Sequence, residues 1–568
     1  MNRNQNLQRL QTEMFDLCII GGGASGAGCA LDAALRGLKV ALIEKSDFAA
    51  GTSSKSTKLV HGGVRYLEQA FKNFDFAQLR QVRHGLEERH IVLQNAPHLA
   101  QPLALITPVF SWWEKLYFSI GLTLYDWFAS GKDTLPKSRQ LSKTETLRLL
   151  PGLSTRISGA VLYYDGQMDD ARYCLALAQS AAEAGAAVVN YVEVIDFKKD
   201  KNGRLDAAIA ASRAPAAPEG TPVTPFEIRS RVFLNCSGVH TDQVRRLANP
   251  ALPPRIRPSK GVHVVLPRQT LGHGNEALLI PKTRDGRMVF AVPFENGLLL
   301  GTTDNDYSEL DKEPSLESGE TEFLLEALQP FLRQKIDKSQ IKAGFGGLRP
   351  LIQSSPPQGL QPSNLPTFKP SKSLVRDHEV EHDPASNLLS LLGGKWTTYR
   401  LMAKDAVNAA CALLDIRAVC RTENHLLSGA RNWSPDLWKK IQAEYGLETD
   451  ISQHLARKYG ARAHEVAALA QGEPGLSKRL LTGHPFLKAE VVYAVRAEMA
   501  LYVRDFLARR IRLESTDWQA AQDAATTVAG AMARELGWTK AEQTRQVETY
   551  LAMLQEFRET AGLPSSKL

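Results

Sequence analysis

Cysteine is scarce in this chain, and its few cysteines stand far apart. Six occur in 568 residues, and no two of them form a C-x-x-C pair. Such spacing predicts neither a structural zinc site nor a disulfide framework. We therefore expect a reducing compartment and no bound metal. Cys18 and Cys29 lie in apolar stretches, where a small buried thiol is the usual outcome.

Long apolar runs are also missing. No window offers the roughly 20 apolar residues that a membrane-spanning helix needs. The amino end is polar and lacks the apolar core of a secretory signal. We therefore expect a cytoplasmic protein, with attachment to a membrane surface left open.

The charge balance is mildly basic, with a net charge of +8 and a pI near 9.0. This bias suits an anionic substrate or an anionic membrane surface. Nucleic acid is not expected as a partner, because the basic residues are scattered and lack interleaved aromatic side chains. The length predicts more than one domain.

A glycine-rich turn between two apolar runs is the most informative stretch. Residues 15–20 predict a buried strand, and G-x-G-x-x-G spacing and an alanine-rich helix follow. The helix amino end favours a pyrophosphate, and an acidic residue closing the second strand favours a ribose diol. The stretch predicts a dinucleotide site without separating NAD from FAD. Its candidate residues are Gly21, Gly23, Ala24, Ser25, Gly26 and Glu44.

Hydroxyl side chains are unusually dense in the next segment. They indicate either an exposed Ser/Thr loop or a second cradle of donors for phosphate oxygens. A glycine pair follows, which brings the backbone close to a neighbour. The candidate cofactor contacts are Thr52, Ser53, Ser54, Ser56, Lys58, His61, Gly62 and Gly63.

GGGASGAG followed by TSSKSTKLVHGGVRYLE resembles the flavin-binding start of the FAD-dependent glycerol-3-phosphate dehydrogenases. These enzymes belong to the D-amino-acid-oxidase-like flavoprotein superfamily, so the resemblance favours FAD as the cofactor. It continues through residues 159–197, 341–352, 393–398 and 497–515. Cys-Ser-Gly-Val-His at 236–240 departs from the family's Ala-Thr-Gly-Pro-Trp.

The resemblance implies an α/β fold: a Rossmann-like FAD-binding domain with an inserted antiparallel β-sheet substrate cap and an all-helical C-terminal domain. Short alternating strands from residue 258, with a turn at Glu295-Asn296-Gly297, agree with such a cap. The expected oxidoreductase domain covers 1–425, with FAD-binding parts at about 14–110, 155–257 and 341–425 and the cap at about 258–340; the helical domain covers 426–568. Further cofactor contacts implied are Val194, Ser237, Gly238, Gly394, Lys395, Trp396 and Thr397.

The reaction implied is oxidation of sn-glycerol 3-phosphate to dihydroxyacetone phosphate. A phosphorylated substrate calls for cations, preferably arginines that bind two oxygens at once. His61 is our candidate base, with an orienting role towards the flavin as the alternative; Arg349 is the second catalytic candidate, as a stabiliser of the alkoxide. Tyr66 is either a substrate contact or a packed side chain. The substrate-binding candidates are Arg65, Tyr66, Arg349, Arg376 and Lys395.

Several alternatives stay open at this stage. Electrons pass either to membrane quinone, our first expectation, or to oxygen, as in related oxidases. An amine or amino-acid oxidase and a non-enzymatic flavin scaffold are weaker alternatives. We expect a peripheral position on the inner face of the cytoplasmic membrane, and a homodimer is one option.

Three further segments lie outside the chemistry. Residues 103–130 are rich in aromatic side chains and favour a helix pair packed in the core, with an interfacial amphipathic element as the alternative. Residues 354–373 predict an exposed Pro-rich loop. The arginine-rich run near residue 510 predicts a partly solvated helix face.

Overall fold

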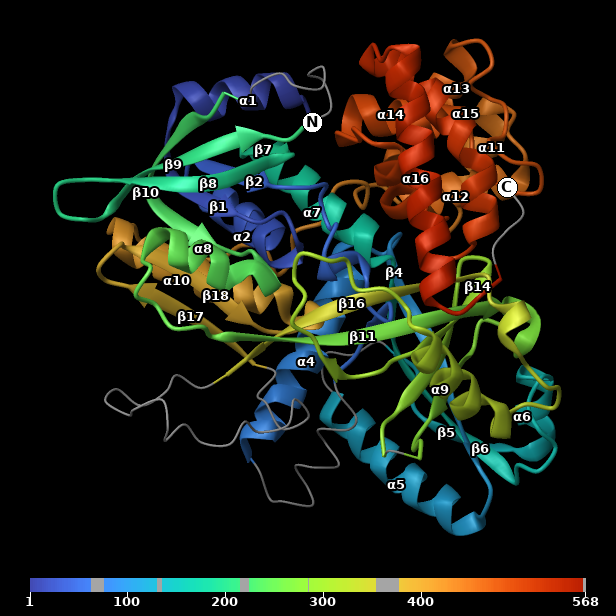
Figure 1. The fold of residues 1–568 in the computed structure, drawn as a ribbon. Coiled ribbons are helices and arrows are strands. Elements are labelled where there is room, and N and C mark those ends of the chain that lie inside the picture. Colours follow the sequence, from blue (N-terminus) through green and yellow to red (C-terminus); the bar gives the residue numbers. More distant parts are fainter. Residues whose placement is uncertain (63–75, 130–134, 215–223, 285, 354–376, 565–568) are drawn as a thin grey trace.

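The computed structural model describes residues 1–62, 76–129, 135–214, 224–284, 286–353 and 377–564. Two β-sheets lie side by side, and a body of helices from the C-terminal part packs next to both (Figure 1). The α/β fold with a helical C-terminal region is therefore confirmed.

The first sheet has eight strands, in the order β17-β18-β10-β1-β2-β7, with β9 beside β10 and β8 beside β9. Its centre is parallel, because β1 pairs with both β2 and β10 in parallel register. A buried parallel strand is apolar along its length, as β1 is from Leu17 to Ile20. The strands are β1 (Met14–Ile20), β2 (Val40–Glu44), β7 (Ala187–Asn190), β8 (Val192–Lys199), β9 (Leu205–Ser212), β10 (Phe226–Asn235), β17 (His378–Asp383) and β18 (Leu388–Gly393).

Three helices pack together on this sheet: α2 (Ala24–Leu35), α7 (Asp170–Glu183) and α10 (Tyr399–Leu414). Helices α2 and α10 each follow a strand of this sheet through a turn, as the strand–turn–helix pattern predicts, whereas α7 follows a strand outside this sheet, Gly159–Met168. Alanine, cysteine and leucine side chains of these helices are buried against the sheet. The dinucleotide turn therefore lies at the carboxyl end of β1, where α/β folds place their ligands.

The second sheet has ten strands and is antiparallel except where β12 pairs with β4. The expected turn at Glu295-Asn296 joins two of its strands. The strands are β3 (Leu59–Val60), β4 (Ala100–Val109), β5 (Arg139–Ser142), β6 (Gly159–Met168), β11 (Ile256–Pro267), β12 (Ala277–Ile280), β13 (Val289–Phe294), β14 (Gly297–Gly301), β15 (Asn305–Asp306) and β16 (Ala343–Ile352).

The cap sheet is wider than the expected range 258–340. It takes β3, β4 and β6 from the part of the chain before residue 170, and β16 from beyond residue 340. The pairing of β4 with β6 and of β11 with β16 joins strands far apart in sequence. Strand alternation alone does not reveal such partners, so we keep the division into domains as a prediction.

Residues 103–130 do not form the helix pair expected from their aromatic content. Their first part belongs to strand β4, and the rest is the single helix α5 (Trp112–Ala129). Only part of α5 packs in the core: Leu122 is 3% exposed and Phe118 packs against the same cluster, whereas Trp112 is 61% exposed and Trp113 64% exposed. Their indole rings stack with centroids 3.6 Å apart.

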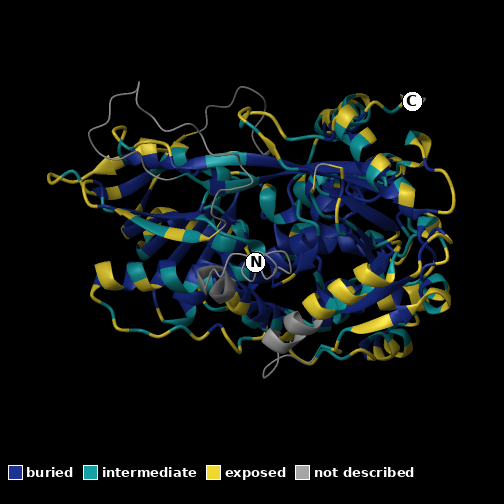
Figure 2. Cartoon of the chain, turned by 90° about the horizontal axis from the view of Figure 1, so that it is seen from below, coloured by how far each residue is buried: buried dark blue, intermediate teal, exposed yellow. Residues whose placement is uncertain are grey.

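Other helices surround the sheets. Figure 2 shows buried residues along the central strands and helices and exposed ones on the outer helix faces and loops. Among the described residues, none of the helices has the length and apolar character needed to cross a bilayer. These surrounding helices are α1 (Arg3–Thr12), α4 (Phe76–Asn95), α6 (Lys143–Leu149), α8 (Thr241–Ala248) and α9 (Ser318–Leu328).

The C-terminal region is helical, as expected. A π-helical turn, Asp505–Arg510, interrupts it. The prediction of a partly solvated arginine face is wrong here, since Arg510 and Arg512 are each 1% exposed. The helices are α11 (Leu437–Tyr445), α12 (Thr449–Tyr459), α13 (Ala463–Gly472), α14 (Lys488–Glu498), α15 (Trp518–Leu536) and α16 (Lys540–Thr560).

Candidate active site

A single cavity of about 1160 Å³ lies where the two sheets and the C-terminal helices meet. Its walls include the glycine turn after β1, the hydroxyl-rich segment, strands of the cap sheet and residues of α16. A volume of this size holds a large ligand together with a small one.

The glycine turn has the backbone geometry that the fingerprint requires. Gly21 has φ +116°, and a Cβ there would lie 2.6 Å from the carbonyl oxygen of Cys236. A Cβ on Gly26 would lie 1.8 Å from the carbonyl oxygen of Gly21. Both positions therefore need glycine, and the turn can approach a ligand closely.

Helix α2 begins at this turn. Gly23 precedes it and offers no side-chain cap, so the first N–H groups of the helix face the cavity region. The Ala24 N–H donates to Ser53 Oγ at 2.9 Å, which brings the hydroxyl-rich segment onto the same helix end. The amino end of α2 is thus a site for anionic oxygens.

Glu44 lies where a ribose contact is expected. Its carboxylate accepts hydrogen bonds from the Gly22 N–H at 2.6 Å and the Ser46 N–H at 2.8 Å. Burial raises the pKa of Glu44 above its ordinary value, and the Ser46 and Gly22 N–H groups oppose that rise. The carboxylate lines the cavity and fits the hydroxyl groups of a ribose.

The glycine pair before α10 forms the other end of the cradle. Gly393 and Gly394 have φ +66° and +88°, and a Cβ on Gly394 would lie 2.3 Å from Met402 Cε. Lys395 and Trp396 follow and line the cavity. Trp396 Nε1 donates to the Ser53 carbonyl oxygen at 3.0 Å, so the two cradle segments are joined directly.

Arg349 stands on the cap wall of the cavity, on strand β16. Its guanidinium lies 3.4 Å from the Asp304 carboxylate and donates to the Thr303 carbonyl oxygen at 3.1 Å. These contacts hold the cation at the wall, while its side chain stays partly exposed to the cavity. An arginine fixed in this way is suited to bind an anion.

The sequence analysis missed His263, which lines the cavity on strand β11. Its Nε2 lies 3.0 Å from Thr57 Oγ1, and its ring stacks on Phe345. Burial, followed by the charges of Lys58 and Arg349, lowers the pKa of His263 well below its ordinary value. His263 is therefore a neutral imidazole on the cap-sheet wall of the cavity. Its polar ring within the apolar run VHVVLP was the available signal.

The cavity brings most of the predicted residues together. Gly26, Ser54 and Lys58 are not among its lining residues; Gly26 packs on the turn, and the Lys58 ammonium is buried against Asp170. Gly63, Arg65, Tyr66, Arg376 and the loop 354–373 lie outside the described residues. The predicted residues that line the cavity are Gly21, Gly23, Ala24, Ser25, Glu44, Thr52, Ser53, Ser56, His61, Gly62, Val194, Ser237, Gly238, Arg349, Gly394, Lys395, Trp396 and Thr397.

These residues fit FAD. The cavity is lined by the glycine turn after β1, the amino end of α2 and the Glu44 carboxylate, which suit the pyrophosphate and the ribose of a dinucleotide. Gly62, Gly393 and Gly394 line the same cavity. Hydrogen bonds from Ala24 and Trp396 to Ser53 hold these segments together, although they are far apart in sequence.

Comparison with known proteins decides the family. Residues 16–381 match the model of FAD-dependent oxidoreductases, and residues 420–543 match the C-terminal domain of alpha-glycerophosphate oxidase. Mitochondrial glycerol-3-phosphate dehydrogenase of Rattus norvegicus is 39% identical over 559 residues, covering 96% of this chain and 74% of the relative. The chain belongs to the FAD-dependent glycerol-3-phosphate dehydrogenase family.

Further relatives agree with this membership. The human mitochondrial glycerol-3-phosphate dehydrogenase is 38% identical over 558 residues, covering 96% of this chain and 74% of the relative. The glycerol-3-phosphate dehydrogenase from Bacillus halodurans, solved in complex with FAD, superimposes with a TM-score of 0.76 at 27% identity and covers 97% of both chains. FAD as the cofactor is thereby confirmed.

The glycine turn provides the first test. In a Gly26→Ala variant the new methyl would collide with the Gly21 carbonyl, so the turn must shift and FAD should bind at least about tenfold more weakly, equivalent to about 1.4 kcal/mol. Flavin absorbance per protein and a flavin titration of the apoprotein measure this. Gly319→Ala is the control, because a Cβ at Gly319 meets nothing within 4 Å. Unchanged FAD affinity in the Gly26→Ala variant would contradict the assignment of the turn.

Proposed function

We propose that this protein oxidises sn-glycerol 3-phosphate to dihydroxyacetone phosphate. The observation that carries the proposal is Arg349, an anchored cation on the wall of the same cavity as the dinucleotide turn. The match to glycerol-3-phosphate dehydrogenases over almost the whole chain supports the same substrate. Bound FAD supplies the hydride acceptor.

The residues around the substrate have complementary roles in this proposal. The Arg349 guanidinium stabilises negative charge on the substrate's C2 oxygen, and Lys395 contributes a cation at the opposite, flavin-side segment. Arg65, Tyr66 and Arg376 complete the phosphate site by the family resemblance.

Two histidines compete for the role of base. His61 follows β3 at the cavity, as the sequence analysis proposed. His263 is the second candidate because it lines the same cavity, but its lowered pKa makes the neutral imidazole a weak base, which favours His61. The Nδ1 of His263 is buried without a hydrogen-bond partner among the described residues. Comparing the pH profiles of flavin reduction in His61→Asn and His263→Asn variants assigns the base.

The membrane is proposed as the site of action, with quinone as electron acceptor. Helix α5 supports this proposal. It lies at the edge of the molecule away from the C-terminal helices (Figure 1), and Trp112, Trp113, Leu116, Tyr117 and Ile120 on it are exposed. Tryptophan and tyrosine prefer the headgroup level of a bilayer. Such a helix lies in the interface without crossing it.

The substrate proposal has a direct test. Adding glycerol 3-phosphate to the anaerobic holoenzyme should bleach the flavin absorbance, and Arg349→Ala should slow the reduction by roughly 100-fold or more while FAD stays bound, as expected for a lost transition-state contact. A flavin that stays oxidised with this substrate would sink the proposal. Once the flavin is reduced, the relative rates of reoxidation by a quinone analogue and by air decide the acceptor.

The membrane proposal is tested separately. A Trp112→Ala/Trp113→Ala variant should bind anionic vesicles at least about tenfold more weakly, because two large apolar side chains no longer leave water. Vesicle co-sedimentation measures this, and FAD content and flavin reduction should not change. Val419→Ser is the matched control, since Val419 is 74% exposed but lies outside α5. Equal binding by wild type and the double variant would refute α5 as the contact.

A further inference from the structure

The hydroxyl-rich cradle has little regular structure of its own. Residues 47–58, which we call the cradle segment, contain one short 3₁₀ turn, Thr52–Ser54. Thr52, Ser53 and Ser56 of this segment line the cavity. Because an irregular segment lacks the hydrogen-bond ladders of helices and strands, its shape depends on contacts from outside.

Buried arginines of the C-terminal region contact the start of the cradle segment. Arg509 Nε donates to Asp47 Oδ2 at 2.5 Å, and Arg510 donates to both carboxylate oxygens at 2.7 and 3.0 Å. Burial alone would raise the pKa of Asp47, but Arg510 and Arg509 outweigh it and hold that pKa below its ordinary value. Asp47 is therefore a fully buried carboxylate whose charge is balanced by another part of the chain.

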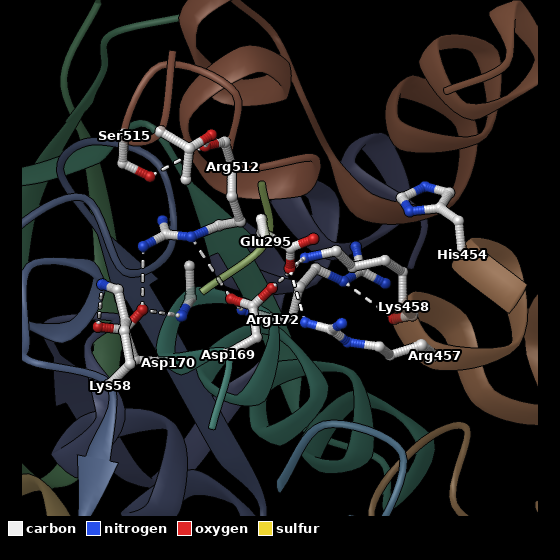
Figure 3. Close-up of polar contacts among 12 residues, drawn as sticks. Lys58, Asp169, Asp170, Arg172, Glu295, His454, Arg457, Lys458, Arg512 and Ser515 are labelled. Atoms are coloured by element: carbon white, nitrogen blue, oxygen red, sulfur yellow. Dashed lines mark hydrogen bonds and ion pairs between the residues drawn. The ribbon is translucent and has the colours of Figure 1, made fainter. Parts of the chain in front are cut away.

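A third arginine reaches the other end of the segment (Figure 3). Arg512 Nη2 donates to the Ser54 carbonyl oxygen at 2.8 Å and to Asp170 Oδ1 at 3.1 Å. The same Asp170 carboxylate accepts hydrogen bonds from the Ser56 N–H at 3.0 Å and the Ser56 hydroxyl at 2.7 Å. Lys58 closes the group by donating to Asp170 and to the Ser54 carbonyl. Arg512 thus acts on Ser56 of the cavity wall through one intermediate carboxylate.

The middle of the segment is held through the cap. Lys55 Nζ donates to Glu313 at 2.9 Å, and Arg504 donates to both oxygens of the same carboxylate at 2.6 and 2.8 Å. The cradle segment, the cap and the C-terminal region therefore meet at Glu313. This is the third point at which a C-terminal arginine fixes the segment.

The backbone that carries these arginines has two uncommon conformations, a π-helical turn and a residue with positive φ. Arg509 and Arg510 lie in the π-helical turn Asp505–Arg510, and Arg512 has φ +67°. π-Helical turns and left-handed non-glycine residues occur where the surrounding structure maintains them for a purpose. Here they direct the side chains of Arg509, Arg510 and Arg512 towards the cradle segment and its partner Asp170.

We propose that the C-terminal region positions the FAD cradle, with Arg512 as the principal positioning residue. Arg510 and Arg512 are not among the residues that line the cavity, so they act on the cradle through Asp47, Ser54 and Asp170; Arg509 lines the cavity and also binds Asp47. The C-terminal region thereby sets how tightly FAD is retained. The inference depends on FAD binding alone and not on the proposed substrate, so failure of one leaves the other standing.

The contacts of Lys458 provide a control, because they also hold the C-terminal region against the rest of the protein but do not involve the cradle segment. Lys458 of the C-terminal region is also buried, and its ammonium donates to Asp169 at 2.6 Å and to Glu295 at 2.7 Å (Figure 3). It joins the same parts of the molecule, but neither partner belongs to the cradle segment. Removing it should loosen the contact between these parts without reshaping the cradle.

The test compares full-length holoenzymes carrying Arg512→Met or Lys458→Met. We expect Arg512→Met to release FAD roughly tenfold faster, within the usual range of coupling between two sites, and Lys458→Met to stay within about twofold of wild type. The rise of flavin fluorescence on dilution measures release, and thermal unfolding of both apoproteins measures stability. The two variants should lower the apoprotein melting temperature similarly.

The outcomes separate clearly. Unchanged FAD release in Arg512→Met, or equally fast release in both variants, overturns the inference, because only the positioning role predicts a difference. If Arg512→Met does not fold, Arg512→Lys takes its place: it keeps the charge but is shorter, so it reaches Ser54 and Asp170 less well, and it loses the second hydrogen bond of the guanidinium, from Nη1 to the Ala508 carbonyl. Faster FAD release from Arg512→Lys than from Lys458→Met supports the inference, and wild-type release refutes it.

Discussion

Two fully buried carboxylates, Asp47 and Asp170, are the constraint on which much of this structure depends. A charge removed from water is tolerated only when opposite charges and hydrogen-bond donors surround it. Arg509, Arg510 and Arg512 supply much of that compensation from the far end of the chain. The flavin-binding part and the C-terminal helices therefore form one electrostatic unit around the cofactor cradle.

The two sheets contribute different kinds of residues to the cavity. The parallel sheet supplies the glycine turn and the ribose carboxylate at strand ends, which suits the cofactor. The cap sheet supplies Arg349 and His263 from neighbouring strands, which suits the substrate. In the antiparallel register Arg349 faces Ser259, four residues before His263, so both side chains stand on one face of the sheet. In the proposed reaction, cofactor and substrate therefore meet in the cavity between the two sheets.

Helix α5 carries exposed aromatic side chains that do not contribute to the core. Packing leaves the described indole rings of α5 in solvent, although burying them in the core would stabilise the fold. A cluster of large apolar side chains on one helix is costly in water and indicates a partner surface. The peripheral position at a lipid surface that we propose would account for this helix and for the basic net charge together.

Local sequence determined the elements whose structure depends on nearby residues. The β1–α2–β2 unit and the need for glycine at Gly26, where a Cβ would meet the Gly21 carbonyl, follow from spacing, because these steric limits act within a few residues. At Gly21 the limit also comes from the Cys236 carbonyl of a distant segment. The family resemblance located most of the cavity lining. The density of hydroxyl side chains in residues 52–57 led us to place Ser54 and Lys58 at the cofactor, but neither is among the residues that line the cavity.

Only the tertiary structure decided the contacts between distant segments. Lys58 has φ +65°, which turns its side chain towards Asp170, and spacing along an irregular segment does not show such a turn. Strands β4, β6 and β16 join the cap because of pairing across long stretches of chain. Tertiary packing also decided that the tryptophans of α5 are exposed and that Arg509, Arg510 and Arg512 are buried. Composition fixes that these side chains are apolar or charged, but burial is set by which other parts of the chain fold against them.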